Sequence, residues 1–235
     1  MLTILYQSVF LQKTVLKITA EFYRMIELQN ISLQLNDRKL FDKLSVEVPA
    51  GGRLLILGGS GSGKTTLLRM LLGFVLPDSG KILIDGEELT LENVWSLRQK
   101  MAYVSQEMQI GRGKAETFIK EVFKFRNNRK ISYDRSKVLS LLEDFQLNSG
   151  TLDKDLEEIS GGELQRFAII VTLLLDRKIY LMDEATSALD EPLKKLIVSY
   201  FDNMDNKTLI ISSHDNVWHK QNYSILNLEE HGSST

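Results

Sequence analysis

The segment GGSGSGKTT, residues 58–66, has the composition and spacing of a loop that binds phosphate. It satisfies the pattern G-x-x-x-x-G-K-[ST] through Gly58, Gly63, Lys64 and Thr65. Successive backbone N–H groups in such a loop form a nest for phosphate oxygens, and glycine permits the backbone angles and close approach that the nest requires. We expect the Lys64 ammonium to reach the outer phosphates and the Thr65 hydroxyl to bind Mg²⁺. The predicted phosphate-binding residues are Gly58, Gly59, Ser60, Gly61, Ser62, Gly63, Lys64, Thr65 and Thr66.

A second stretch, KIYLMDE at residues 178–184, carries two carboxylates at the end of an apolar strand. Ligands of open α/β sheets bind at the carboxyl edge of the sheet, where such strands end. We therefore expect Asp183 to bind the same Mg²⁺ as Thr65, and Glu184 to orient or deprotonate an attacking water. Acidic residues also end ordinary solvated strands, but their pairing with the phosphate loop favours a metal site.

The motif SGGE at residues 160–163 places two glycines at the start of a predicted helix. Ser160 and Glu163 match a capping box, in which side chains satisfy backbone N–H groups of the first turn. That explanation does not cover Gly161 and Gly162, since glycine costs about 1 kcal/mol relative to alanine within a helix. Glycines leave bare N–H groups at the positive end of the helix dipole, which suits a phosphate. Because the chain already has one phosphate loop, the motif predicts that two copies complete each other's sites.

Strands and helices must position these motifs, and the apolar patterns predict both. Partial alternation at 26–35 and 44–48 indicates antiparallel strands with one buried face. The apolar run at 53–59 predicts a strand buried on both faces, followed by a helix from Lys64. Residues 107–159 have a helical, charged pattern, after which helices and strands alternate. The sequence thus predicts a mostly parallel sheet flanked by helices, with a helical subdomain at about 107–159.

Composition limits the cellular setting and the partners. The chain has 235 residues, a formal net charge of −2 and no cysteine. This balance gives no overall basic field for nucleic acid, and disulfides are excluded. No apolar run approaches the ~20 residues that would cross a bilayer, and the N-terminus lacks the pattern of a secretory signal. We predict a cytoplasmic protein whose domain starts at Met25, and interpret residues 1–24 as a poorly ordered extension rather than a helix that docks on a partner.

Together the motifs resemble those of the ATP-binding cassette (ABC) ATPases. GGSGSGKTT, VSQE, ISGGELQR, IYLMDEATSALD and ISSHD occur in the order and approximate spacing of that family, from about Met25 to Leu228. The resemblance implies an α/β P-loop NTPase fold with a RecA-like core, an antiparallel β-subdomain and an inserted helical subdomain. It also implies an ATPase that binds ATP and Mg²⁺ and forms a head-to-tail homodimer on ATP binding. Each ATP would lie between the phosphate loop of one copy and the SGGE helix start of the other.

The resemblance assigns roles to further residues, position by position. Gln106 resembles the glutamine that senses Mg²⁺ and the attacking water and signals to a transport partner. His214 resembles the switch histidine that contacts the terminal phosphate and steadies the water. Residues 187–190, SALD, resemble the segment that crosses the dimer interface, which places Asp190 in the predicted nucleotide site. His219 and His231 match no motif, and we predict that they are surface residues.

One position departs from the family pattern. These cassettes commonly place an aromatic residue upstream of the phosphate loop to stack on adenine, and the corresponding position holds Leu35. Aromatic stacking contributes about 1 to 3 kcal/mol per base, so we expect lowered ATP affinity or relaxed nucleotide preference. A Leu35→Tyr variant with unchanged ATP affinity would contradict this expectation. Whether Phe41 replaces the missing aromatic stays open at the level of sequence.

The motifs fit more than one class of cassette protein. The first is the energy-coupling subunit of a membrane transporter, held at the inner face of the cell membrane by a separately encoded transmembrane permease. The alternative is a cassette ATPase of nucleic-acid maintenance or translation, although those usually carry a long coiled coil or two cassettes. A binding module without turnover is disfavoured by Glu184 and His214. We predict the transporter class, with no nucleic-acid partner and no regulatory domain after His214.

A basic stretch in the predicted helical subdomain has two interpretations. It is either a surface facing the membrane subunit or a solvated helix whose aromatic side chains face the core. Its cations are Lys120, Lys124, Arg126, Arg129 and Lys130, interleaved with Phe118, Phe123 and Phe125.

Overall fold

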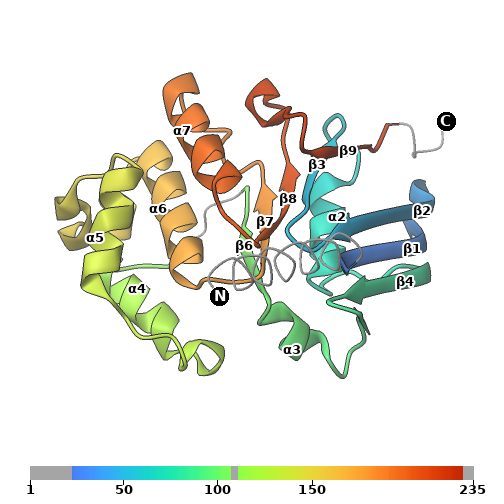
Figure 1. Ribbon diagram of the computed structural model, residues 1–235, viewed down its shortest axis with the longest axis horizontal. Coiled ribbons are helices and arrows are strands. Elements are labelled where there is room, and N and C mark those ends of the chain that lie inside the picture. Colours follow the sequence, from blue (N-terminus) through green and yellow to red (C-terminus); the bar gives the residue numbers. More distant parts are fainter. Residues whose placement is uncertain (1–22, 107–110, 230–235) are drawn as a thin grey trace, which may run out of the picture.

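The structure, a computed structural model, describes residues 23–106 and 111–229 (Figure 1). Residues 1–22, which make up nearly all of the predicted N-terminal extension, lie outside the described residues, as does His231. None of the helices within the described ranges is long and apolar enough to cross a bilayer.

A parallel sheet forms the centre of the molecule (Figure 1). Its strand order is β6-β7-β8-β3-β9, and every neighbouring pair is parallel. The strands are β6 (Met101–Val104), β7 (Ile179–Asp183), β8 (Thr208–Ser212), β3 (Arg53–Leu57) and β9 (Ser224–Asn227). The two strands β7 and β8 are buried along their whole length, as their continuous apolar runs require. Their carboxyl ends therefore meet at one edge of the sheet, beside the carboxyl end of β3.

A smaller antiparallel sheet has the order β2-β1-β4-β5. Its strands are β1 (Arg24–Leu35), β2 (Arg38–Pro49), β4 (Ser79–Ile84) and β5 (Glu87–Glu88). The sequence predicted the second of these only from Leu44, whereas β2 begins at Arg38. Register shifts along the β1–β2 pair break the alternation of apolar residues, and Lys43 has a positive φ of 53°. Because the pairing is irregular, the first half of β2 lacks the alternation of apolar and polar residues by which a strand is recognised in a sequence.

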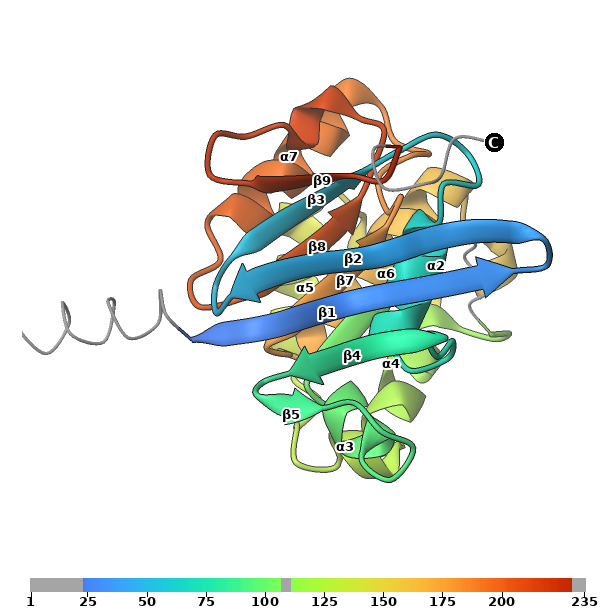
Figure 2. The same ribbon diagram turned by 90° about the vertical axis from the view of Figure 1, so that its right-hand side faces the viewer.

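Helices cover the parallel sheet and separate it from the antiparallel one. The helices are α2 (Lys64–Leu71), α3 (Val94–Arg98), α4 (Ala115–Lys124), α5 (Arg135–Asp144), α6 (Gly161–Leu174) and α7 (Glu191–Asp202). Short 3₁₀ turns lie at Arg126–Asn128, Ser149–Asp153, Leu156–Glu158 and Asn216–Trp218. Figure 2 shows α2 behind the antiparallel sheet, and its apolar side chains share one core with strands of both sheets. Helix α2 is thereby packed between the two sheets.

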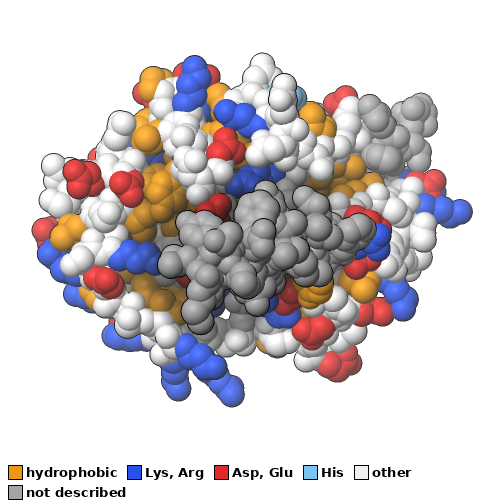
Figure 3. Space-filling model, in the orientation of Figure 1, with side chains coloured by type: hydrophobic (Ala, Val, Ile, Leu, Met, Phe, Trp, Pro, Cys, Tyr) orange, Lys and Arg blue, Asp and Glu red, His pale blue; other side chains and the backbone are white. Residues whose placement is uncertain are grey.

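A second hydrophobic core joins the other face of the parallel sheet to α4, α5 and α6. The described elements between residues 111 and 159 are α4, α5 and three 3₁₀ turns. In the basic stretch, Phe123 is buried and Phe118 packs against the core, whereas Phe125 is exposed. Lys120 and Lys124 pair with acidic residues of their own helix. Figure 3 shows basic side chains projecting at the lower edge of the molecule, over the loop that follows α4 in Figure 1. Two of the three aromatics thus follow the solvated-helix interpretation.

Candidate active site

The loop between β3 and α2 forms one wall of a cavity of about 280 Å³. The cavity is lined by Ser60, Gly61, Ser62, Gly63, Lys64, Thr65, Thr66, Gln106, Glu184 and His214. Gly63 has a φ of 104°, and a Cβ at this position would lie 2.9 Å from Cζ of the buried Phe41 ring. Only glycine fits this backbone angle at such a close approach. The loop can therefore turn its backbone N–H groups inward, as a phosphate nest requires.

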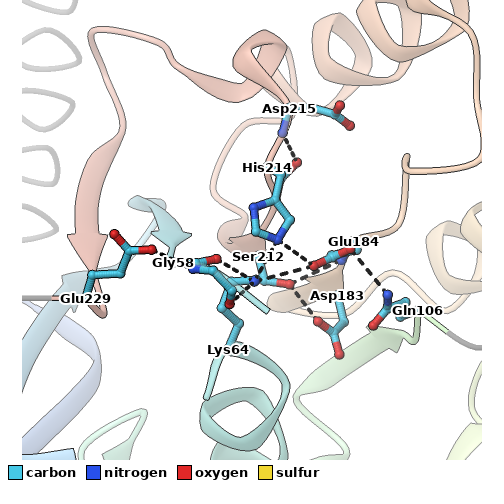
Figure 4. Close-up of polar contacts among 11 residues, drawn as sticks. Gly58, Lys64, Gln106, Asp183, Glu184, Ser212, His214, Asp215 and Glu229 are labelled. Carbon is cyan, nitrogen blue, oxygen red and sulfur yellow. Dashed lines mark hydrogen bonds and ion pairs between the residues drawn. The ribbon is translucent and has the colours of Figure 1, made fainter. Parts of the chain in front are cut away.

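Lys64 is buried, with 6% of its surface exposed, and its ammonium points to the end of the loop (Figure 4). Its Nζ donates to the carbonyl oxygens of Gly58 at 2.7 Å and Gly59 at 3.2 Å. A third contact joins Nζ to Nε2 of His214 at 2.9 Å, and Oε1 of Glu184 lies at 3.5 Å. All three ammonium hydrogens thus have acceptors on the chain.

Nε2 of His214 lies between the Lys64 ammonium and the Glu184 carboxylate. Because an ammonium group can only donate, Nε2 of His214 must accept from Lys64, which leaves the ring hydrogen on Nδ1. In this tautomer the 3.3 Å contact between Nε2 and Oε1 of Glu184 is not a hydrogen bond.

Glu184 lies at the turn that follows β7, with a positive φ of 47°. Its backbone N–H donates to the carbonyl oxygen of Ser212 at 3.0 Å and to the hydroxyl of the same residue at 3.2 Å. Its carboxylate accepts from Nε2 of Gln106 at 3.3 Å. These contacts aim the carboxylate into the cavity between Lys64, Gln106 and His214 (Figure 4).

Asp183 is fully buried, and hydroxyl groups hold both of its carboxylate oxygens. The Ser212 hydroxyl donates to Oδ1 at 2.6 Å, and the Tyr103 hydroxyl donates to Oδ2 at 3.1 Å. Burial raises the pKa of Tyr103, and the Asp183 charge raises it further, so this hydroxyl stays a donor at neutral pH. A second cavity, of about 360 Å³, is lined by Asp183 together with Thr65 and Gln106.

The predicted metal ligands Thr65, Gln106 and Asp183 thus face one cavity beside the phosphate loop. No group of three or more His, Cys, Asp or Glu in the described ranges could hold a metal by itself. One carboxylate, one hydroxyl and one amide suit Mg²⁺, which takes oxygen ligands, keeps several waters and binds together with substrate phosphates.

The SGGE motif lies apart from both cavities, because none of its four residues lines either of them. Oε2 of Glu163 accepts from the Ser160 hydroxyl at 2.8 Å and from the Ser160 backbone N–H at 3.1 Å. The hydrogen bond from the Ser160 hydroxyl holds the pKa of Glu163 below its usual range. The capping interaction is therefore present, whereas a Cβ added at Gly161 would meet no other described residue within 4 Å.

Asp190 and Gln165 connect α6 and α7 to the loop after β7. The Asp190 carboxylate caps α7 by accepting from the Leu193 backbone N–H at 3.1 Å. The buried Gln165 amide lies 3.5 Å from the Glu184 carbonyl oxygen and accepts from the Ala188 N–H at 3.2 Å. Asp190 therefore has a local structural role, and the structure places it outside both cavities.

Sequence reasoning did not find Tyr103, Ser212, Gln165 or Glu229. The first two hold Asp183 from the neighbouring strands, and Oε1 of Glu229 accepts from the Gly59 N–H at 2.9 Å. Ser212 directly precedes the SHD segment and could have been found from its hydroxyl at the end of an apolar strand. The other three carry no local signal.

The family model described as "ABC transporter" matches residues 41–187, more than half of the sequence. A probable iron export ATP-binding protein of Escherichia coli (strain K12) is 34% identical over 167 residues, which cover 71% of this chain and 73% of that protein. The chain therefore belongs to the ABC transporter family. Membership implies that the chain binds ATP and has ATPase activity, and the predicted resemblance is confirmed.

Other relatives are much longer. ABC transporter B family member 13 of Arabidopsis thaliana is 33% identical over 203 residues, which cover 80% of this chain and 16% of that protein. A solved bacterial Atm1-family ABC exporter with ATP bound is 28% identical, with a TM-score of 0.75, covering 87% of this chain and 37% of that chain. The fold of this solved exporter confirms the predicted P-loop NTPase fold. The roles of the individual site residues remain predictions.

Proposed function

We propose that this chain binds and hydrolyses ATP to drive a membrane transporter, acting as a homodimer with a separately encoded transmembrane permease at the inner face of the cell membrane. The observation that carries the proposal is the cluster of Lys64, Gln106, Glu184 and His214 in one cavity with the phosphate loop. A phosphate loop alone would support binding. The carboxylate of Glu184, aimed at the same cavity, supports hydrolysis.

The chain's own groups divide the reaction among them. Loop N–H groups and Lys64 bind the phosphates, and Glu184 orients the attacking water and accepts its proton as the water oxygen bonds to the terminal phosphorus. The bond from that phosphorus to the bridging oxygen breaks, which gives ADP and phosphate. Gln106 donates a hydrogen bond to the Glu184 carboxylate and holds it in place, and we expect His214, beside it, to contact the terminal phosphate. Mg²⁺, held by Thr65 and Asp183, would neutralise phosphate charge when bound.

The isolated SGGE motif supports a dimer. Ser160 and Glu163 satisfy each other within the helix start, but no neighbour among the described residues explains Gly161. Bare backbone at the positive end of α6 is complementary to a phosphate brought by another molecule. A second copy carries such a phosphate on its own loop, so head-to-tail pairing would use both motifs.

An exposed aromatic cluster supports a further protein partner. Phe74 and Trp95 are 63% and 65% exposed, and the Arg98 guanidinium lies over both rings at 4.1 Å and 4.8 Å. Phe74 also lines the cavity that contains Gln106 and Asp183. Large exposed aromatics of this kind mark interaction sites, so a permease bound here would lie next to the predicted metal site.

The Glu184→Gln variant tests the proposal. We expect ATP hydrolysis to fall by about 100-fold or more, as for loss of a general base, while ATP binding persists. Size-exclusion chromatography with ATP and Mg²⁺ should then show an ATP-dependent dimer. Glu191→Gln, which changes an exposed carboxylate of α7, is the matched control and should hydrolyse ATP at the wild-type rate.

Two results would contradict parts of this proposal separately. Retained hydrolysis in Glu184→Gln would exclude this residue as the catalytic carboxylate. A variant that binds ATP yet stays monomeric would exclude a dimer formed by ATP alone.

A further inference from the structure

We propose that Arg38 is a nucleotide-contacting residue that binds the phosphate chain of the nucleotide at the exposed rim of the phosphate loop. This inference rests on the proposed function, because it assigns a further residue to the same site. The contact would offset part of the affinity that the aliphatic Leu35 is expected to cost.

Phe41 is not available to the nucleotide. Its ring is completely buried, and it packs beneath the loop, against Gly63. Leu35 itself is 42% exposed at the end of β1. Neither position can therefore stack an aromatic ring on a base, and any compensating contact has to come from another group.

The β1–β2 hairpin places Arg38 close to the phosphate loop. A two-residue turn, Asn36 and Asp37, joins the strands, and Leu35 lies directly opposite Arg38. Asn36 has a φ of 52°, which is typical of such tight turns. Figure 2 shows this turn on the same side of the molecule as the loop between β3 and α2. The short turn holds Arg38 at the hairpin end, beside the phosphate loop.

The Arg38 guanidinium contacts the phosphate loop at Gly61. A Cβ placed on Gly61 would lie 3.4 Å from Nη1 of Arg38, so the guanidinium lies against Gly61, which lines the cavity. Arg38 is exposed, and its guanidinium has no hydrogen bond or ion pair within the described part of the chain. The next residue, Lys39, is by contrast paired with Asp42 at 2.7 Å.

Two cations, Lys64 and Arg38, therefore lie on different sides of the phosphate loop. Lys64 reaches it from the buried side, and Arg38 lies at its exposed rim. A guanidinium presents planar pairs of N–H groups that match phosphate oxygens, and such charge-assisted hydrogen bonds are among the stronger ones. The contact would be independent of the base, which distinguishes it from aromatic stacking.

Calorimetric binding of ATP, GTP and inorganic tripolyphosphate with Mg²⁺ tests the inference. We expect Arg38→Ala to weaken all three by a similar factor, about 10- to 100-fold in about 50 mM salt, with Arg38→Lys intermediate. The factor should shrink at about 0.5 M salt, because the group is exposed and its charge is screened. Lys39→Ala removes the same charge from the neighbouring position and should change each dissociation constant by less than about threefold.

The outcomes separate the inference from the proposed function. If wild-type protein binds ATP and Arg38→Ala binds it equally well, the inference is wrong and the proposed function stands. An Arg38→Ala defect for ATP but not for tripolyphosphate would place the contact on the nucleoside and would also overturn the inference. Failure of the wild-type chain to bind any of the three ligands would reject both.

Discussion

Asp183 illustrates how single residues around the site are fixed by their neighbours. A buried carboxylate is costly unless hydrogen bonds satisfy it, and here hydroxyl groups from β6 and β8 bind its two oxygens. Such groups behind a metal ligand orient it, and their loss typically costs about 10- to 100-fold in metal affinity or activity. Tyr103 and Ser212 are therefore positioning residues rather than catalytic ones.

We predict that Tyr103→Phe raises the Mg²⁺ concentration needed for half-maximal ATP hydrolysis by about tenfold or more. The phenyl ring keeps the packing, and only the hydrogen bonds of the hydroxyl, to Oδ2 of Asp183 and with Arg69, are lost. ATP binding measured in excess chelator should be unchanged. Tyr133→Phe is the matched control, since its hydroxyl donates to Glu116 at 2.7 Å, away from the cavity. An unchanged Mg²⁺ requirement in Tyr103→Phe would exclude the positioning role.

At the scale of elements, the first turn of α6 carries two separable features. The pair Ser160 and Glu163 satisfies the helix start within one chain. Gly161 and Gly162 have room for a methyl group, since the nearest atoms to a Cβ at Gly162 lie 3.5 Å away. Neither glycine has a positive φ. The fold of the monomer therefore tolerates alanine at these positions, and the glycines need an explanation outside it.

We predict that Gly161→Ala leaves the free energy of unfolding unchanged or raises it by up to about 1 kcal/mol, because alanine loses less backbone entropy. In the Glu184→Gln background the same change should abolish the ATP-dependent dimer. Denaturant unfolding and size-exclusion chromatography give the two readings. A variant that is less stable than its parent, yet still dimerises, would show that the glycine serves the monomer.

At the scale of the whole molecule, two surfaces of different chemistry are available for association. One consists of the phosphate loop and the start of α6, where charge and helix dipole dominate. The other is the exposed aromatic cluster of Phe74 and Trp95. Salt weakens contacts at the first surface by screening their charges. Salts that are excluded from protein surfaces, such as sulfate, strengthen the apolar contacts of the second.

We predict that the ATP-dependent dimer of Glu184→Gln dissociates as NaCl is raised from about 0.05 M to about 0.5 M, because contacts between phosphate and helix end are screened. Replacing Phe74 and Trp95 together by serine should leave this dimer intact, because we assign the aromatic cluster to the interface with the permease and not to the dimer interface. Light scattering across a salt series measures both. A dimer that persists at high salt and is lost in the double variant would assign the aromatic cluster to self-association.

Short-range patterns were sufficient for much of this protein. The spacing of Gly58, Gly63, Lys64 and Thr65 and the apolar run before Asp183 identified the phosphate loop and the acidic strand end, because backbone angles and burial act over a few neighbouring residues. The same patterns located most helices and strands. They missed α3, β5 and β9, which have five residues or fewer and too little periodicity.

Tertiary structure alone decided which distant groups meet. Strand order places β6 and β8 on either side of β7, which brings Tyr103 and Ser212 to Asp183. Pairing of β1 with β2 buries Phe41 under Gly63 and leaves Arg38 beside Gly61. Such contacts depend on register and layer packing between segments far apart in sequence, and these leave no periodic trace in either segment. Local chemistry was therefore readable from the sequence, whereas the contacts of Tyr103, Ser212 and Arg38 were not.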